Sequence, residues 1–449
     1  MKTQYTSTCN SCRLCSPLGA CLVFKGVDGA MPFIHGSQGC ATYIRRYIIG
    51  HFREPMDIAC SNFSEQTAVF GGKDNLHVGL ENVTRQYTPQ LIGVATTCLS
   101  ETIGDDVKLF LHAIGKEWQA GPMPIVVPVS TPSYQGSHSE GFHLAVKALV
   151  ETLAEREAVG DHVNLFGNMI SPQDIRYLKA VCRDFGLNAM VLPDYSDSLD
   201  GGVWEAYERI PSGGTSIEAI RRSGSAKASI EFSTTARDDC SAAALLNERF
   251  GVPCHRLRLP IGISASDTWF RLLSKFSGRD IPIEHVRERA RLVDAYVDGH
   301  KYIFEKRAVV YGEEDLVVAL AAFLCEIGII PAVCATGGAK DGSMKRALAK
   351  AIGEQIGQVT VLEDADFKDI EQAAMNARPD ILIGNSNGAK IARALAVPLV
   401  RIGLPVHDRL GAARLQMIGY QGTQQLFDRL VNAFIEVKQE SSPVGYTHM

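Results

Sequence analysis

The sequence predicts an α/β protein built from three Rossmann-like, doubly wound domains with mainly parallel sheets. Its 449 residues exceed what one hydrophobic core usually covers, so more than one domain is expected. Short runs of Val, Ile and Leu recur along the chain, and segments with helical periodicity follow them. Continuous apolar runs are typical of strands buried on both faces of a parallel sheet, and strand–helix alternation indicates doubly wound layers.

Six apolar runs are the strand candidates, in chain order Leu91–Ala95, Ile125–Val129, Ala189–Leu192, Ala308–Tyr311, Val359–Leu362 and Ile381–Ile383. The small-residue segments Ser212–Ser216 and Ser223–Ser225 predict loops inside a domain. The charged segment Glu284–Asp298 and the apolar segment Leu316–Glu326 have helical periodicity. The Gly-rich run Ala335–Ser343 lacks the GxxxxGKS/T pattern of a phosphate loop, so it predicts a turn between a strand and a helix.

The same pattern divides the chain into three ranges. Residues 1–150 are expected to form an N-terminal α/β domain, and residues 151–299 a middle α/β domain that ends in a long helix. Residues 300–449 are expected to form a C-terminal α/β domain. The last boundary lies where the charged helix gives way to the strand candidate at Ala308.

Composition and charge exclude several classes of protein. Hydrophobic residues make up 46% of the chain and charged residues 21%, which are ordinary proportions for a soluble protein. The formal net charge of −5, without a basic cluster, argues against nucleic-acid binding. The N-terminus lacks the apolar core of a signal peptide, and no run reaches the roughly 18 apolar residues of a membrane span. We therefore expect a cytoplasmic protein that binds neither nucleic acid nor membrane.

The twelve cysteines are unevenly distributed, because seven lie within the first 98 residues. In a reducing compartment they are not expected to form disulfides, which leaves core thiols and metal ligands. Those outside any motif are interpreted as packed or inert thiols: Cys21, Cys60, Cys182, Cys240, Cys254, Cys325 and Cys334. Cys9, Cys12 and Cys15 have ferredoxin-like spacing without a fourth cysteine. A thiol-bearing flexible tail is the simpler interpretation of Cys9 and Cys12, with metal binding as the alternative.

Four N-terminal segments combine cysteine, serine and glycine: CSPLGA at 15–20, HGSQGC at 35–40, ATTCLSE at 95–101 and STPSYQGSH at 130–138. Cys98 and Ser133 each closely follow a strand candidate, which places them at the carboxyl edge of a parallel sheet, where open α/β sheets bind ligands. Cys40 follows Gly36 and Gly39, which allow close approach of the backbone to a bulky group. Each cysteine alone is more simply structural, but the set predicts thiolate ligation of an iron–sulfur cluster.

The order of these motifs resembles the β subunit of nitrogenase component 1. The motifs that carry the resemblance are CSPLGA, HGSQGC, FREP, VFGG, TTCLSETIGDD and TPSYQGSH, which lie between about residues 15 and 140. Their spacing is also that of the family, and a weaker resemblance continues to the C-terminus. The chain has the β-type HGSQGC rather than the α-type HGPVGC, so no substrate ligand is assigned to it.

The resemblance implies that Cys15, Cys40 and Cys98 ligate an [8Fe-7S] P-cluster shared with an α-type subunit. Ser133 matches the serine that can ligate one iron when that cluster is oxidised. Phe70, in VFGG, matches an aromatic residue where the ATP-hydrolysing iron protein, a homodimer, docks. The resemblance also implies an α2β2 heterotetramer whose catalytic iron–sulfur cofactor lies in the α partner, so no catalytic residue is assigned here.

A second group of residues carries carboxylates. Asp294 and Asp298 lie four residues apart in a predicted helix and therefore share one face. Their oxygens suit a hard divalent cation, although a solvated face paired with basic neighbours is the simpler interpretation of the residues alone. The family resemblance implies instead that Arg53, Glu54, Asp294 and Asp298 form a β–β interface site for a calcium or iron ion.

Three functions within the family differ in their cluster chemistry: a reductase subunit, the β-like half of a cofactor-assembly scaffold, and a non-enzymatic homologue. The presence of Cys98 and Ser133 favours a complete cluster and electron relay, because the scaffold chains often lack that cysteine. The first ligand falls at residue 15, before which there is no long extension of the molybdenum-nitrogenase type. We therefore expect a nitrogenase-like reductase such as methylthio-alkane reductase, with the scaffold as the alternative and a dinitrogenase β subunit third.

Overall fold

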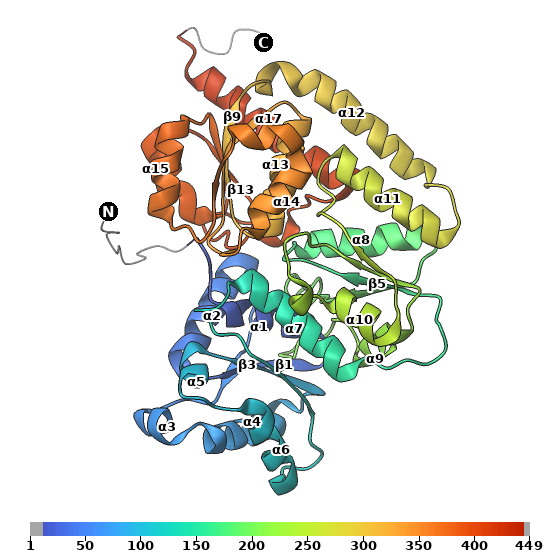
Figure 1. The fold of residues 1–449 in the computed structure, drawn as a ribbon, viewed down its shortest axis with the longest axis vertical. Helices are drawn as coiled ribbons and strands as arrows, with labels where there is room; N and C mark the ends of the chain where they lie inside the picture. The colour runs from blue at the N-terminus through green and yellow to red at the C-terminus, as the bar shows by residue number, and fades with distance from the viewer. Residues whose placement is uncertain (1–11, 444–449) are drawn as a thin grey trace.

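The computed structural model describes residues 12–443, which form an α/β protein with three parallel sheets (Figure 1). The predicted fold class is confirmed. The strand orders are β2-β1-β3-β4, β6-β5-β7-β8 and β11-β10-β9-β12-β13, and every neighbouring pair is parallel. The strands are β1 (Ala30–His35), β2 (Ala59–Cys60), β3 (Leu91–Thr96), β4 (Ile125–Val129), β5 (Val163–Phe166), β6 (Ala189–Leu192), β7 (Ala228–Glu231), β8 (Cys254–Arg256), β9 (Arg307–Tyr311), β10 (Ile330–Ala335), β11 (Thr360–Leu362), β12 (Ile381–Gly384) and β13 (Leu399–Arg401).

Helices connect the strands, as parallel pairing requires. They are α1 (Ser16–Lys25), α2 (Gln38–Phe52), α3 (Glu65–Phe70), α4 (Lys73–Tyr87), α5 (Cys98–Thr102), α6 (Val107–Glu117), α7 (His138–Leu153), α8 (Pro172–Asp184), α9 (Ile217–Arg221), α10 (Ala242–Phe250), α11 (Ile263–Ser277), α12 (Ile283–Ile303), α13 (Glu314–Glu326), α14 (Ser343–Ile352), α15 (Phe367–Ala377), α16 (Ala389–Leu395) and α17 (Gly419–Glu440). Within residues 12–443, no helix is both long and apolar enough to cross a membrane.

All six strand candidates are strands, with ends within one residue of those expected. The helices expected at 284–298 and 316–326 are α12 and α13, and the Gly-rich run is the turn between β10 and α14. The loop expected at Ser223–Ser225 is wrong, because these residues belong to a short 3-10 helix, Arg222–Ser225. The strands of each sheet lie within one of the three expected ranges, and the domain boundaries themselves remain predictions.

The strands that the sequence did not reveal carry residues that interrupt an apolar run. β1 contains Pro32 and ends on His35, β10 contains Pro331, and β7 ends on Glu231. β1, β7 and all but the first residue of β10 are nonetheless buried, and the fold supplies polar partners that a local pattern cannot show. Glu231, for example, accepts a hydrogen bond from the buried Ser241 hydroxyl at 2.5 Å.

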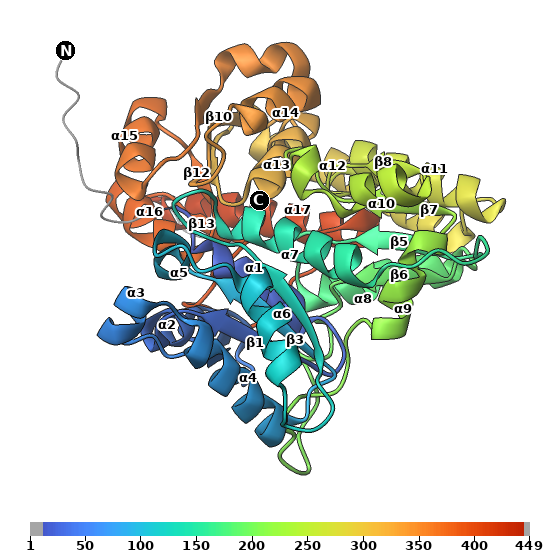
Figure 2. The same ribbon diagram turned by 60° about the horizontal axis from the view of Figure 1, so that its bottom comes forward.

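The three sheets share one core at the centre of the molecule. The largest cluster of buried apolar residues is continuous in space and includes residues from Leu18 in α1 to Phe434 in α17. Each sheet and its helices form one lobe, and the lobes are numbered in chain order. α7 lies in the middle of the view, between the three lobes (Figure 1). α17 packs against α12 and α11 (Figure 2). The first sheet therefore has α1 and α7 on its inner side, while a separate cluster with α4 and α6 covers the other face.

The crossing of α1 and α7 depends on two glycines. A Cβ at Gly19 would lie 1.9 Å from the His138 carbonyl oxygen, and a Cβ at Gly141 would lie 2.0 Å from the Ser16 carbonyl oxygen. Both neighbours are backbone atoms, so the helices cannot yield locally. This close approach holds the start of α1, and with it Cys15, against the start of α7.

We therefore expect Gly141→Ala to lower the free energy of unfolding by about 1–3 kcal/mol, because it overpacks a helix crossing. Thermal unfolding of the purified protein measures the change. Gly115→Ala is the matched control, since a Cβ there meets only the Met123 sulfur at 4.0 Å and alanine is the better helix former. Equal melting temperatures for Gly141→Ala and the unmodified protein would contradict the packing argument.

Candidate functional site

Most of the candidate site residues lie at the carboxyl edge of the first sheet, where each strand leads to one of them. β2 leads to α3, which ends at Phe70, and β1 leads to the loop before Cys40 in α2. β3 leads directly to Cys98, the first residue of α5, and β4 leads to the loop that carries Ser133. Because all four strands are parallel, their carboxyl ends lie along one edge, as was expected for Cys98 and Ser133.

Cys15 reaches this edge from a segment outside the sheet. It forms an isolated antiparallel bridge with Ser137, and the Leu14 carbonyl accepts the His138 N–H at 3.1 Å. The Ser16 N–H donates to the Ser133 Oγ at 3.1 Å. The chain segment before α1 is therefore pinned to the loop that follows β4.

The three thiols lie close enough to influence one another. Partial desolvation of the Cys15 thiol raises its pKa, the hydrogen bond with Ser133 lowers it, and the neighbouring Cys40 and Cys98 raise it again. The Ser133 N–H donates to the Cys98 sulfur at 3.2 Å, and the Ser37 hydroxyl donates to the Cys40 sulfur at 3.5 Å. The structure thus brings together all four residues that the sequence singled out for a cluster.

The thiol group faces the surface. Cys15 and Cys98 are exposed, and Cys40 and Ser133 are half-buried. Three large side chains close to these residues in sequence, those of Tyr43, Leu99 and Tyr134, are also exposed. Among residues 12–443, no group of three His, Cys, Asp or Glu side chains is arranged to hold a single metal ion. Thiols that converge on an open face suit a larger group completed by a second chain.

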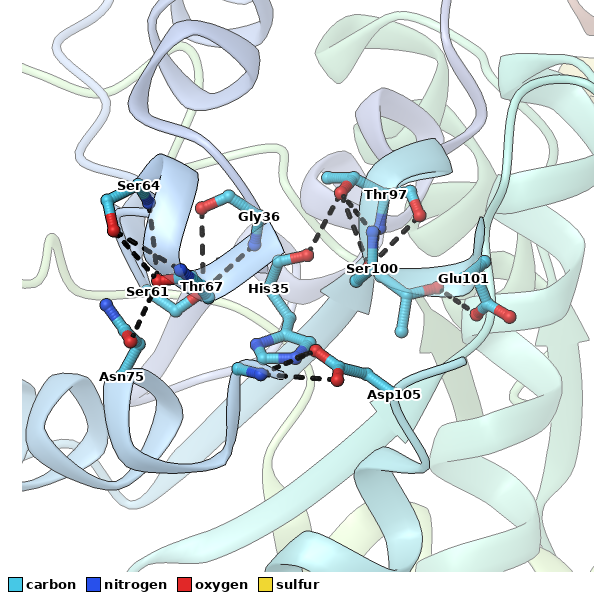
Figure 3. A network of polar contacts seen from close by, with 12 residues as sticks. His35, Gly36, Ser61, Ser64, Thr67, Asn75, Thr97, Ser100, Glu101 and Asp105 are labelled. Carbon is cyan, nitrogen blue, oxygen red and sulfur yellow. Dashed lines mark hydrogen bonds and ion pairs between the residues drawn. The ribbon is translucent and has the colours of Figure 1, made fainter. Parts of the chain in front are cut away.

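A largely buried polar network that the sequence did not predict lies at the ends of the strands that lead to the thiols; Figure 3 shows part of it. His35 is fully buried at the end of β1, and its Nε2 lies 2.9 Å from Asp105 Oδ2. Glu101 accepts the hydroxyls of Thr96 at 2.5 Å and Ser130 at 2.6 Å, which joins the ends of β3 and β4. His35 belongs to the motif HGSQGC, and Thr96, Glu101 and Asp105 belong to TTCLSETIGDD. Ser130 is the first residue of STPSYQGSH, so all of these residues lie in the motifs that contain the candidate ligands.

Phe70 lies on the surface beyond this network. Its side chain is 87% exposed and that of Val69 is 74% exposed, at the end of the six-residue helix α3. Ser64 and Thr67 cap the start of this helix, and Gly71, with φ of 91°, ends it. An exposed aromatic on a short, well-capped helix has the properties of an interface anchor.

The second predicted group is not brought together within one chain. Arg53 follows α2 and donates to the His407 carbonyl at 2.7 Å, and burial raises the pKa of Glu54. Asp294 and Asp298 are exposed on α12, in a different part of the molecule from α2 (Figure 1). Any site that uses all four residues requires a second copy of the chain.

The remaining cysteines lie where core thiols were expected, some fully and some partly buried. Burial raises the pKa of Cys182 and Cys240 to about 12 and that of Cys325 to about 11, which keeps them protonated and poor as ligands. Cys12 does not belong to a flexible tail, because it is buried in the third lobe, with its N–H directed to the Ala365 carbonyl. Cys9 lies outside the described residues.

The chain matches the family model of nitrogenase component 1 type oxidoreductases over residues 15–435. It is 33% identical to the nitrogenase molybdenum-iron protein beta chain of Methanothermobacter thermautotrophicus, over 94% of this chain and 93% of that one. It is 34% identical to the beta chain of Clostridium pasteurianum, over 95% and 93%. It is 32% identical to the nitrogenase iron-molybdenum cofactor biosynthesis protein NifN of Bradyrhizobium diazoefficiens, over 98% and 92%.

A solved structure described as nitrogenase Cp1 at pH 6.5 superposes on the whole of this chain and on 98% of its own, with a TM-score of 0.95 and 31% identity. A second chain, from nitrogenase Cp1 at pH 5, matches with a TM-score of 0.71 and 18% identity, which shows a shared fold.

Proposed function

The chain belongs to the nitrogenase component 1 type oxidoreductase family, and from this premise we propose that it is the electron-relaying β-type subunit of a nitrogenase-like reductase. In this proposal it shares an [8Fe-7S] P-cluster with an α-type partner and receives electrons from an ATP-hydrolysing iron protein. The observation that carries the proposal is the convergence of Cys15, Cys40 and Cys98, with Ser133, on one open face.

The residues present fit an iron–sulfur group. Such a group stores electrons and passes them on, and it requires thiolates and hydrogen-bond donors to sulfur. Cys98 receives the Ser133 N–H and Cys40 the Ser37 hydroxyl, while Ser133 hydrogen-bonds with Cys15. Iron binds the thiolate, so the Cys15 proton leaves when the group is loaded, which couples assembly of the site to pH.

The partner subunit would close the open side of the site. The exposed thiols and nearby exposed side chains of Tyr43, Leu99 and Tyr134 form a face with aromatic and apolar content, which is typical of the centre of an interface. The catalytic iron–sulfur cofactor belongs to that partner in this proposal, so the present chain contributes electron delivery rather than substrate contacts.

A second copy of the chain would pack against α12. The exposed side chains of Ile283, Val286, Val293 and Val297 follow a heptad spacing along this helix, which is typical of a helix that packs on another. Asp294 and Asp298 lie beside the last two of them. We therefore place the calcium or iron site of Arg53, Glu54, Asp294 and Asp298 at the contact between two β-type chains of an α2β2 tetramer.

Replacing both Asp294 and Asp298 with Asn should weaken the tetramer, because amides neutralise the charge that holds a hard cation. Analytical ultracentrifugation over a dilution series should show dissociation toward αβ pairs at higher protein concentration than for the unmodified complex. A chelator should shift the unmodified complex in the same direction. Glu151→Gln with Glu155→Gln, an exposed acidic pair elsewhere, is the control. Tetramers of undiminished affinity would identify the aspartates as a solvated face only.

The assembly scaffold remains a second candidate, because a protein named for cofactor biosynthesis, NifN, matches 98% of the chain. A scaffold complex would differ from a reductase in its use of the bound cofactor. It would transfer the cofactor to an acceptor protein, whereas a reductase uses it for turnover. Within the reductase class, methylthio-alkane reductase and dinitrogenase both remain open. The short segment before Cys15 does not separate them, since the beta chains of Methanothermobacter thermautotrophicus and Clostridium pasteurianum are matched over 93% of their own length, whereas that of Frankia alni is matched over 84%.

The test is ATP-dependent reduction by the complex purified with its α-type partner and supplied with its iron protein. We expect turnover of at least one of dinitrogen, acetylene and small organic sulfides, and the product identifies the substrate class. No turnover on all three, together with transfer of a bound cofactor to an apo-acceptor protein, would overturn the relay proposal in favour of the scaffold.

A further inference from the structure

A buried histidine–aspartate pair joins the Phe70 helix to the strands that carry the thiols. Asp105 accepts the Gly72 N–H with both carboxylate oxygens, at 3.2 and 3.1 Å, and lies 2.9 Å from His35 Nε2. The side chains of His35 and Asp105 are 0% and 3% exposed. Figure 3 shows the carboxylate of Asp105 beside the ring of His35.

Gly72, the second glycine after Phe70, has no room for a side chain. A Cβ at Gly72 would lie 2.6 Å from Asp105 Oδ2 and 2.5 Å from the Phe63 ring. Phe63 in turn packs edge-on against His35, with ring centroids 4.8 Å apart. The end of α3 is therefore held directly against the pair, and a shift of Phe70 cannot be absorbed by a flexible side chain in between.

From the pair, rigid contacts continue to two of the thiols. The His35 carbonyl accepts the Thr97 hydroxyl at 3.1 Å, and Thr97 caps α5, whose first residue is Cys98. His35 is also followed by Gly36, which lies close against Thr97, since a Cβ at Gly36 would lie 2.4 Å from the Thr97 Oγ1. The chain then enters α2, which carries Cys40 in its first turn. Asp105 itself follows α5 in sequence and donates its N–H to the Ser100 carbonyl at 3.1 Å.

We infer that Asp105 and His35 are positioning residues that couple a partner bound at Phe70 to the positions of Cys40 and Cys98. This inference rests on the proposed function, since it takes the partner to be an electron-donating protein. Docking that displaces the end of α3 moves the Gly72 N–H, the Asp105 carboxylate and the His35 ring together. The thiols at the ends of β1 and β3 move with them, so electron transfer is permitted only when the donor is seated.

The test uses Asp105→Asn in the complete complex with its partner and iron protein. Asparagine keeps the shape but loses the charge and one of the two oxygens that hold Gly72. We expect kcat for ATP-dependent turnover to fall about ten-fold or more, within the usual range of coupling between sites. The KM for iron protein, the iron content and the reduction of the complex by a small low-potential chemical reductant should stay unchanged.

Two further variants keep the test decisive. His35→Gln, which retains a donor toward Asp105, should lose kcat less than Asp105→Asn does. Asp106→Asn is the matched control, because this exposed neighbour only caps α6 through the Leu109 N–H. A rise in KM alone, or a loss of iron in both His35→Gln and Asp105→Asn, would overturn the inference and leave a docking or a merely structural role. Failure of the proposed function would appear separately, as a lack of ATP-dependent turnover in the unmodified complex, which is measured beside every variant.

Discussion

Replacing Cys98 with Ala is expected to strip iron from the complex and to abolish the electron paramagnetic resonance signal of its oxidised cluster. Cys98 is exposed at the start of α5 and accepts only the Ser133 N–H, so its loss costs the isolated chain little stability. A methyl group cannot ligate iron, and no other thiol among the described residues is assigned to the same position. Cys40→Ala is expected to have the same effect.

Three measurements make this result specific: iron per complex, the spectrum of the oxidised protein, and the melting temperature. Cys254→Ala is the thiol control, because this half-buried residue lies on β8 in the second sheet and should keep iron unchanged. Ser133→Ala keeps the N–H that reaches Cys98 and should retain iron while altering the oxidised spectrum. An unchanged iron count and spectrum in both Cys40→Ala and Cys98→Ala would refute the cluster assignment.

The second large effect is expected for Phe70→Ala, which should cut ATP-dependent turnover steeply while leaving the iron content intact. The side chain is 87% exposed, so its removal takes away an anchor without opening a cavity. Anchors of this kind contribute roughly 2 kcal/mol or more to an interface, which corresponds to about a thirty-fold loss of affinity for the iron protein.

Turnover measured against iron-protein concentration should therefore show a raised KM for Phe70→Ala. This differs from the behaviour expected of Asp105→Asn, where kcat falls instead. Val159→Ala, which truncates an apolar side chain that is 70% exposed elsewhere, is the surface control and should leave both constants unchanged. Wild-type kinetics in Phe70→Ala would show that the iron protein does not use this surface.

Most of the strands that could be predicted have an uninterrupted apolar run, such as Ala189–Leu192. β4 was predicted despite Pro128, because its other residues are Val and Ile. β1 and β10 were missed because each combines a proline with few Val, Ile or Leu residues, and β7 was missed because it ends on a buried glutamate. In all three, burial depends on neighbouring strands and on partners such as Ser241 that lie elsewhere in the chain. Cys12 was misjudged for the same reason, since its neighbours in the third lobe lie hundreds of residues away.

The sequence by itself determined the fold class and the family, because apolar periodicity and motif spacing are local features of the chain. It also singled out Cys15, Cys40, Cys98 and Ser133 as candidate ligands. Only the tertiary structure decided that these residues meet. Their convergence depends on the strand order of the first sheet and on the bridge between Cys15 and Ser137, which spans more than a hundred residues. The His35–Asp105 pair is likewise a product of folding, since the free energy that holds a buried carboxylate comes from partners such as Gly72 that no local pattern connects to it.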